Sequence, residues 1–204
     1  MAKISVRFDL NIPKLKYREL KRPMVLVVDM VNGFVSSGAM ADQSIKEIVP
    51  DIIELLRVVH PSIFFCDNHD LDAKEFESFP LHCIKNTQEA QIIDELKPFA
   101  KAVFKKNSTN AFVNEEINHY LKSIINDYQD FIIVGCCSDI CVMQLALSLN
   151  TYFNEQNLND QNVIVPVNMI ETYHAAGYHD QVDYNEIALK LMQQSGIYIA
   201  EIGE

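Results

Sequence analysis

The strongest constraint on this chain is a series of short apolar segments that alternate with stretches of helical periodicity. Six segments are continuously hydrophobic and rich in β-branched or aromatic residues: Met24–Asp29, Ser62–Cys66, Ala102–Lys105, Asp130–Gly135, Asn162–Val167 and Ile197–Ile202. Strands that are buried on both faces of a parallel sheet have this unbroken hydrophobicity, whereas half-exposed strands alternate apolar with polar residues. We therefore predict six strands in a mainly parallel sheet.

Apolar residues between these segments recur with the period of an α-helix. Ile117, Leu121, Ile124 and Ile125 fall on one helical face, as do the apolar residues of 187–192 before Gly196 and those of 52–59 after Pro50. Strands that alternate with helices predict an α/β fold, a doubly wound sheet with helices on both faces. No linker, repeat or low-complexity segment interrupts the chain, so we predict a single domain over residues 1–204, with residues 1–22 as an N-terminal extension.

Composition excludes several classes of partner. The chain has 17 basic and 28 acidic residues and a net charge of −11, so it lacks the positive surface that nucleic acids or anionic membranes require. No apolar run reaches the roughly 20 residues of a membrane span, and the N-terminus is too polar for a signal peptide. Five cysteines, an odd number, argue against a disulfide framework. We expect a cytoplasmic protein with free thiols, in which Cys66 and Cys83 serve in packing.

Polar residues follow four of the predicted strands. Asp29 ends the first strand, Asp67-Asn68-His69 follows the second, Lys105-Lys106 the third, and Gly135–Cys141 the fourth. In open parallel sheets the chemistry lies beyond the carboxyl ends of the strands, which meet at one edge. We therefore expect an acid, a possible metal-ligand pair, a lysine and a cysteine to converge there.

Cys141 is the candidate nucleophile of this cluster. It precedes the apolar run 142–149, and Ser138 or Asp139 is a suitable N-cap for a helix that begins there. The positive end of a helix favours a thiolate, with Asp29 taking the thiol proton and Lys106 stabilising the charge. The alternative is that Cys141 is a small buried hydrophobic residue, which is the commonest role of a free cysteine.

Asp29, the lysine in segment 105–112 and the segment 135–142 together resemble the three sequence blocks of the isochorismatase-like cysteine hydrolases. The resemblance covers roughly residues 23–200. In the family pattern the lysine lies five residues before the alanine of an Ala-Phe pair, which selects Lys106, and the nucleophile precedes a valine, which selects Cys141. The resemblance also implies a cis peptide bond between Cys136 and Cys137. It further implies an oxyanion hole formed by the backbone amides of Cys137 and Cys141.

A second cluster has the residue types of a metal site. Two imidazoles and a carboxylate, from Asp67, His69 and His82, suit zinc, manganese or iron, although histidines 13 residues apart are more often unrelated. Asp-x-His followed by Phe-Pro-x-His resembles the metal site of the nicotinamidases, a branch of this family. That resemblance implies one divalent metal ion, zinc first and manganese or iron as alternatives, with Glu75 as a fourth ligand and Glu77 as a weaker choice.

The same resemblance implies nicotinamide as the small-molecule substrate. Its pyridine nitrogen would coordinate the metal, and its carboxamide would react with Cys141 to give a thioester and then nicotinate and ammonia. Phe34 and Phe79 would form the aromatic walls of the pocket; Phe79 stands where relatives often carry tryptophan, which this chain lacks. The family resemblance also implies a homo-oligomer.

Other functions are compatible with parts of this pattern. One is hydrolysis of another small carboxamide, and another is cleavage of the vinyl ether of isochorismate, which does not need the Asp67, His69 and His82 cluster. A third alternative is a binding protein that has the same fold but catalyses no reaction. A redox sensor based on Cys136 and Cys137 is less favoured because adjacent cysteines are too constrained to exchange easily. A dehydrogenase is disfavoured because no strand leads into a G-x-G-x-x-G sequence.

Overall fold

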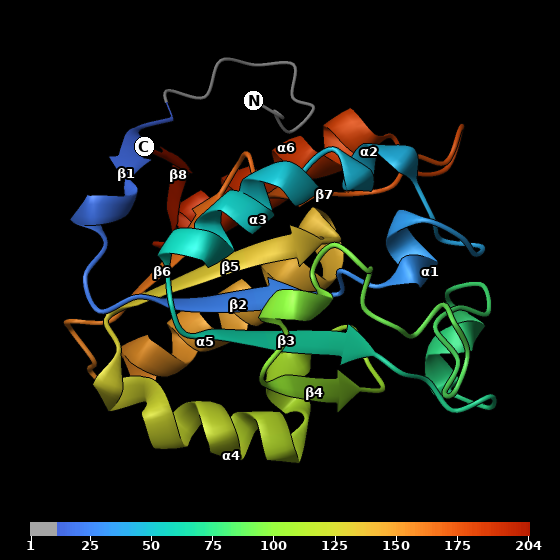
Figure 1. The fold of residues 1–204 in the computed structure, drawn as a ribbon, viewed down its shortest axis with the longest axis horizontal. Helices are drawn as coiled ribbons and strands as arrows, with labels where there is room; N and C mark the ends of the chain where they lie inside the picture. The colour runs from blue at the N-terminus through green and yellow to red at the C-terminus, as the bar shows by residue number, and fades with distance from the viewer. Residues whose placement is uncertain (1–11) are drawn as a thin grey trace.

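The strands of the computed structural model, which describes residues 12–204, join in one sheet whose pairings are all parallel (Figure 1). Each of the six predicted strands is present, with its ends shifted by at most one residue. The order across the sheet is β1 (Lys14–Lys16), β8 (Tyr198–Gly203), β6 (Asn162–Pro166), β5 (Asp130–Cys136), β2 (Met24–Val28), β3 (Ser62–Asp67) and β4 (Val103–Lys106), and β7 (Ile170–Glu171) pairs with the end of β5.

Two of these strands were not predicted from the sequence. β1 lies within the expected N-terminal extension and pairs with β8, where Lys14 stands opposite Glu201. Its sequence Lys-Leu-Lys lacks continuous hydrophobicity because an edge strand is exposed on one side. β7 spans two residues, which is too short for a periodicity signal. Residues 1–11 of the expected extension lie outside the described residues.

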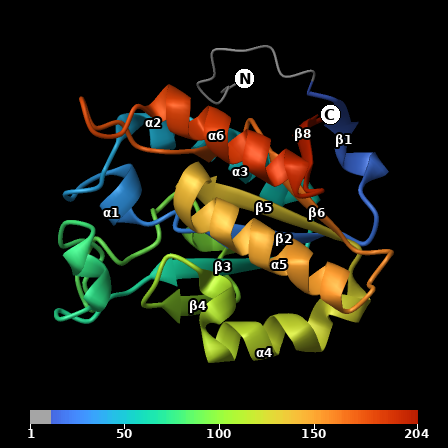
Figure 2. The ribbon, with the colours of Figure 1, turned by 180° about the vertical axis from the view of Figure 1, so that it is seen from behind.

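Helices cover both faces of the sheet, as predicted (Figure 2). α2 (Gln43–Lys46) and α3 (Val49–Val58) pack on one face, and α4 (Glu115–Ile124), α5 (Met143–Glu155) and α6 (Gln181–Gln194) pack on the other. Successive residues of β2 point alternately to the two layers. The shorter helical elements are α1 (Asn32–Val35), the 3₁₀ turns Tyr17–Glu19, Lys74–Glu77, Lys97–Phe99, Ala111–Val113 and Ile125–Asp127, and a π-helical turn Ser138–Val142.

Helix boundaries follow the expected chemistry. Pro50 lies in the first turn of α3, where its missing N–H costs no hydrogen bond, and Gly196 with φ +91° follows α6. The Asn114 side chain accepts a hydrogen bond from the N–H of Ile117 and caps α4. Within the described part of the chain, no helix has both the length and the apolar content to span a bilayer.

The carboxyl ends of β2, β3, β4 and β5 meet at one edge of the sheet, because the four strands are neighbours and parallel. Asp29 directly follows β2, Asp67 ends β3 and Lys106 ends β4, while β5 leads into the π turn that carries Cys141. The predicted convergence of these residues is therefore a direct result of the topology.

Candidate active site

Asp29, Lys106 and Cys141 form one buried cluster. Lys106 Nζ lies 2.7 Å from Asp29 Oδ2 and 3.7 Å from Cys141 Sγ, and all three side chains are excluded from solvent. Lys105 is exposed, since consecutive residues of a strand point to opposite faces. The geometry thus brings together the three side chains that the family pattern selects.

The backbone of Asp29 fixes the direction of its carboxylate. The residue has φ +51°, a left-handed conformation that Asp tolerates better than most residues. Its carbonyl accepts hydrogen bonds from Val31 N–H (2.8 Å) and from the Cys136 thiol (3.2 Å). Its Oδ1 accepts the Asp67 N–H at 2.8 Å, so that Oδ2 is left for Lys106.

Cys141 sits in a π-helical turn that precedes α5. The N–H of Val142 bonds to the carbonyl of Cys137, five residues earlier, which is the spacing of a π turn. The prediction of Ser138 or Asp139 as a helix N-cap was wrong: Cys137 occupies that position and no side chain caps the turn. The peptide bond between Cys136 and Cys137 is cis, as the family resemblance implied.

Tertiary partners explain why neither expected residue caps the helix. The Ser138 hydroxyl donates to Asn185 Oδ1 of α6. The Asp139 carboxylate accepts from the Thr172 hydroxyl at 2.6 Å and from His179 Nε2 at 2.9 Å. These side chains therefore anchor the turn to α6 and to the segment before it instead of to its own backbone.

Gly135 allows β5 to approach β2 immediately before the nucleophile turn. Its φ is +114°, and a Cβ at this position would lie 2.0 Å from the carbonyl oxygen of Val28. Only glycine fits that distance and conformation. The placement of the turn beside Asp29 thus depends on this residue.

Burial sets the electrostatics of the cluster. Burial and the Asp67 carboxylate raise the pKa of Asp29 to about 6, against the opposing effect of Lys106. Burial lowers the pKa of Lys106, but Asp29 and Asp67 raise it well above its ordinary value, so the ammonium is charged. Burial raises the pKa of the Cys141 thiol, with Lys106 opposing. Burial thus opposes the thiolate that a helix end favours, and Lys106 favours it.

The second predicted cluster also forms. Its four candidate ligand atoms are Asp67 Oδ2, His69 Nε2, Glu75 Oε1 and His82 Nε2. Asp67 Oδ2 lies 3.5 Å from His69 Nε2 and 3.7 Å from His82 Nε2, while Glu75 Oε1 lies 3.6 and 3.9 Å from the same nitrogens. A tetrahedral ion with ligands at about 2.1 Å separates them by roughly 3.4 Å. The four side chains are therefore spaced as a candidate site for a divalent metal ion.

Hydrogen bonds orient both imidazoles toward this site. His69 Nδ1 bonds to Asn107 Oδ1 at 3.1 Å, and His82 Nδ1 bonds to the carbonyl of Pro80 at 2.7 Å. A carbonyl and an amide oxygen only accept, so each ring donates from Nδ1 and presents the Nε2 lone pair to the cluster. Asn107 and Pro80 were not predicted, although each lies close in sequence to a predicted residue.

Two buried atoms of the cluster have no hydrogen-bond partner among the described residues. They are Asp67 Oδ2 and His69 Nε2. Buried polar atoms are otherwise nearly always paired, so these two fit a bound cation. Glu75 is held in place because its Oε2 accepts the N–H of Thr109 at 2.9 Å. Glu77 is exposed and lies outside the cluster.

Asp67 joins the two clusters. Its Oδ1 accepts a hydrogen bond from Lys106, and its Oδ2 faces the histidines. Although burial raises the pKa of Asp67, Lys106 and the histidines lower it below its ordinary value. The sequence indicated a ligand role for this residue but not the link to Lys106, which arises because β3 and β4 pair Asp67 with Lys106.

Aromatic rings surround His82. Phe34 is buried and meets the imidazole edge-to-face with ring centroids 5.4 Å apart, and the partly buried Phe79 lies at 6.4 Å. Phe76, which was not predicted, contacts both His69 (5.3 Å) and His82 (5.6 Å). A small cavity, here called the inner pocket, is bounded by Phe34, Met40, Asp67, Phe79, His82 and Cys141.

A parallel α/β sandwich with a buried cysteine beside an aspartate and a lysine at its carboxyl edge has the arrangement of a covalent hydrolase. Comparison with known proteins agrees with this class. Residues 23–201 match the family model described as the isochorismatase domain, and the chain therefore belongs to the isochorismatase family.

Relatives and solved structures place the chain near the nicotinamidases. Nicotinamidase 1 of Arabidopsis thaliana is 25% identical over 207 aligned positions, which cover 87% of this chain and 81% of that protein. The pyrazinamidase of Pyrococcus horikoshii in complex with zinc has a TM-score of 0.71 at 21% identity, over 88% of this chain and 99% of that one. PnC1 from L. infantum in complex with nicotinate has a TM-score of 0.72 at 15% identity, over 90% of this chain and 96% of that one.

Proposed function

We propose that this protein is an amidohydrolase that converts nicotinamide to nicotinate and ammonia through a thioester on Cys141. The observation that carries the proposal is the shared carboxylate of Asp67, which joins the Lys106 and Cys141 cluster to a four-ligand metal site. A substrate ring held at the metal site would have its carboxamide next to the thiol. The similarity to nicotinamidases supports the choice of substrate.

Asp67, His69, Glu75 and His82 would hold the divalent ion, with zinc as the first choice. When bound, the ion supplies a Lewis acid that binds the pyridine nitrogen and so orients the ring. Phe34 and Phe79 lie against His82 and would contact the faces of the ring. Isochorismate has no ring nitrogen, so the metal cluster favours the pyridine carboxamide over the vinyl ether.

The first half-reaction would form the thioester. The Asp29 carboxylate takes the Cys141 proton while the Lys106 ammonium stabilises the sulfur anion, and the sulfur attacks the carboxamide carbon. The backbone N–H groups of Cys137 and Cys141 would stabilise the oxyanion. The C–N bond then breaks as Asp29 gives its proton to the departing nitrogen, which leaves as ammonia.

The second half-reaction would release the acid. Asp29 is again a carboxylate and takes a proton from a water molecule that attacks the thioester carbon. The C–S bond breaks, Asp29 returns the proton to the sulfur, and nicotinic acid leaves and releases its remaining proton to water as it becomes nicotinate. One carboxylate thus acts as base, acid and base, a role that suits a pKa raised to about 6 by burial.

A direct test measures ammonia release from nicotinamide by the purified, metal-loaded protein. We expect Cys141→Ala to lower kcat by about 10³-fold or more, because the covalent route is lost. Thermal melting of the variant checks that it folds. Normal turnover by a folded Cys141→Ala protein would rule out the thioester. Turnover of isochorismate but not of nicotinamide would rule out the amidohydrolase.

A further inference from the structure

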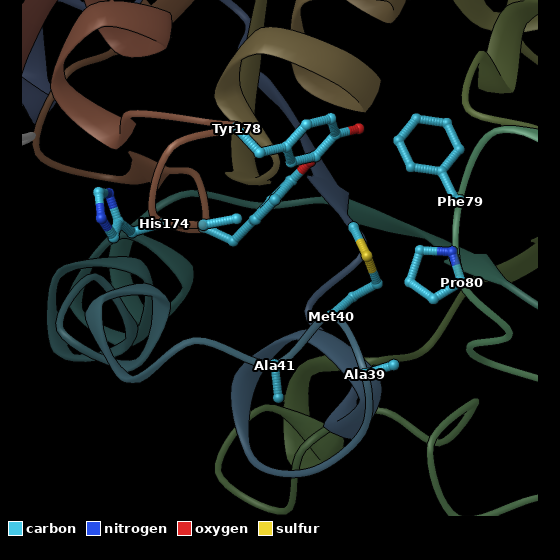
Figure 3. A pocket seen from close by; sticks show the side chains of 9 residues that line it. Ala39, Met40, Ala41, Phe79, Pro80, His174 and Tyr178 are labelled. Carbon is cyan, nitrogen blue, oxygen red and sulfur yellow. The ribbon is translucent and has the colours of Figure 1, made fainter.

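A second cavity lies directly outside the inner pocket. This outer pocket has a volume of about 170 Å³ and is bounded by residues 39–41, Phe79, Pro80 and residues of the segment 173–178 (Figure 3). Figure 3 shows the side chain of Met40 between the two neighbouring alanines and the aromatic rings of Phe79 and Tyr178. None of the proposed catalytic or metal-binding side chains borders it, and Phe79 is the one residue of its lining that is also proposed to contact the nicotinamide ring.

Met40 and Phe79 separate the two cavities, since both residues border each of them. The inner pocket has a volume of about 10 Å³, which is space for one water molecule, so a substrate ring would enter it only when the residues that line it move. The outer pocket is large enough for a ring, because an apolar cavity of roughly 150 Å³ accommodates benzene. Removal of the partition would therefore join a small reactive chamber to a larger apolar one.

Of the two partition residues, Met40 is the one that can move most easily. Its side chain is unbranched with three rotatable bonds, and it lies in the loop between α1 and α2. Phe79 precedes Pro80, whose carbonyl holds His82, and so has less freedom. A rotation of Met40 would open the inner pocket toward the outer one while the metal cluster and Cys141 stay in place.

The walls of the outer pocket are fixed to each other and to the nucleophile turn. Asp42 Oδ2 accepts the N–H of His174 at 2.8 Å, which joins the Met40 loop to the segment 173–178. His179 Nε2 bonds to Asp139, two residues before Cys141, at 2.9 Å. When the walls of a cavity are already ordered, the protein loses less conformational entropy on binding a ligand. This space therefore suits a rigid apolar group.

We propose that the outer pocket is a second subsite of the active site. It binds an apolar ring attached to the far side of a carboxamide substrate, and Met40 is the specificity-determining residue between the subsites. The proposal rests on the proposed function, because it takes the inner pocket as the place of amide hydrolysis. The chain would then accept aryl-substituted pyridine carboxamides as well as nicotinamide itself.

The test compares nicotinamide with a nicotinamide that carries a phenyl group on ring carbon 5. We expect the wild-type protein to hydrolyse both. The ratio of kcat/KM for the phenyl compound to that for nicotinamide should rise about tenfold or more in Met40→Ala and fall about tenfold or more in Ala41→Phe, which fills the outer pocket. Ile187→Ala, at an exposed position on α6, is the control that leaves the ratio unchanged. Rejection of the phenyl compound by the wild type, or an equal ratio in all variants, overturns the proposal.

A binding measurement separates this proposal from the proposed function. The chain contains no tryptophan, so Tyr178→Trp provides a single fluorescent reporter at the rim of the outer pocket. If neither compound is hydrolysed, the proposed function fails, and a titration of this variant then decides the subsite. A change in emission with the phenyl compound and not with nicotinamide supports it. No change with either compound overturns it.

Discussion

Lys106 is the side chain on which the candidate site depends most. It is the only lysine of the described chain that is fully buried, and it contacts both Asp29 and Asp67 as well as Cys141. A buried carboxylate without a cation is costly, because its solvation by water is lost. Two carboxylates close together would also repel each other. The lysine therefore has a structural role that is separable from its proposed role in stabilising the thiolate.

We predict that Lys106→Met lowers the free energy of unfolding by about 3–5 kcal/mol, because it removes one partner of a buried ion cluster. Urea denaturation at neutral pH measures the loss. Lys105→Met is the matched control, since the neighbouring lysine is exposed and its replacement should change stability by about 0.5 kcal/mol or less. Equal effects of the two substitutions would contradict the assignment of Lys106 to the buried cluster.

At the scale of elements, the loops after the strands are held together by polar side chains from distant parts of the chain. His179 stacks between the rings of Tyr173 and Tyr184, with ring centroids 4.1 and 3.8 Å apart. Its Nδ1 is hydrogen-bonded to the Tyr173 carbonyl and its Nε2 to the Asp139 carboxylate. Asp42 caps α2 through Ser44 N–H and also accepts the N–H of His174. These contacts position the loops that border the two pockets.

Asp42→Ala should lower the free energy of unfolding at pH 7 by about 1–2 kcal/mol, because both backbone donors lose their acceptor. Burial alone raises the pKa of Asp42, but the hydrogen bonds from His174 and Ser44 lower it below its ordinary value. A lowered pKa in the folded state means that the stabilisation is present at neutral pH and is lost as the pH falls through that pKa. Urea denaturation at several pH values should therefore show the difference from wild type shrinking in acid. A difference that is independent of pH would argue against the carboxylate as the acceptor.

For the whole molecule, the important feature is that two candidate sites with different side-chain chemistry share one edge of the sheet. The nucleophile cluster draws on β2, β4 and the turn after β5, and the metal cluster draws on β3 and the segment after it. Asp67 belongs to both. Binding of a cation to the folded chain alone should therefore stabilise the entire domain.

We predict that zinc at 100 times its dissociation constant stabilises the metal-free protein by about 2.7 kcal/mol. For a chain of this length, that corresponds to an increase in Tm of about 5–10 °C in a thermal scan. Glu75→Gln should weaken zinc binding measured by calorimetry, whereas Glu77→Gln, with an exposed side chain outside the cluster, should not. A Tm that does not respond to zinc, manganese or iron would exclude the metal site.

The sequence by itself determined the order of the six main strands along the chain, the helices between them and the common edge of their polar ends. It did so because burial on both faces requires continuous hydrophobic segments, and parallel pairing brings their carboxyl ends together. The family resemblance distinguished Lys106 from Lys105, and Cys141 from Cys136 and Cys137, by their positions in the family's sequence pattern. β1 and β7 carried no such signal because they are short, and β1 is exposed.

Features that depend on contacts between distant segments were decided only by the tertiary structure. Ser138 and Asp139 had good local chemistry for a helix cap, but their partners on α6 and on the segment before it took precedence. Burial raises the pKa of the Cys141 thiol, an effect that the position of the residue near a helix end does not include. The contacts of Asp67 with both clusters and the outer pocket beside Met40 likewise depend on segments that are distant in sequence and adjacent in space. A local pattern of residues does not predict such contacts.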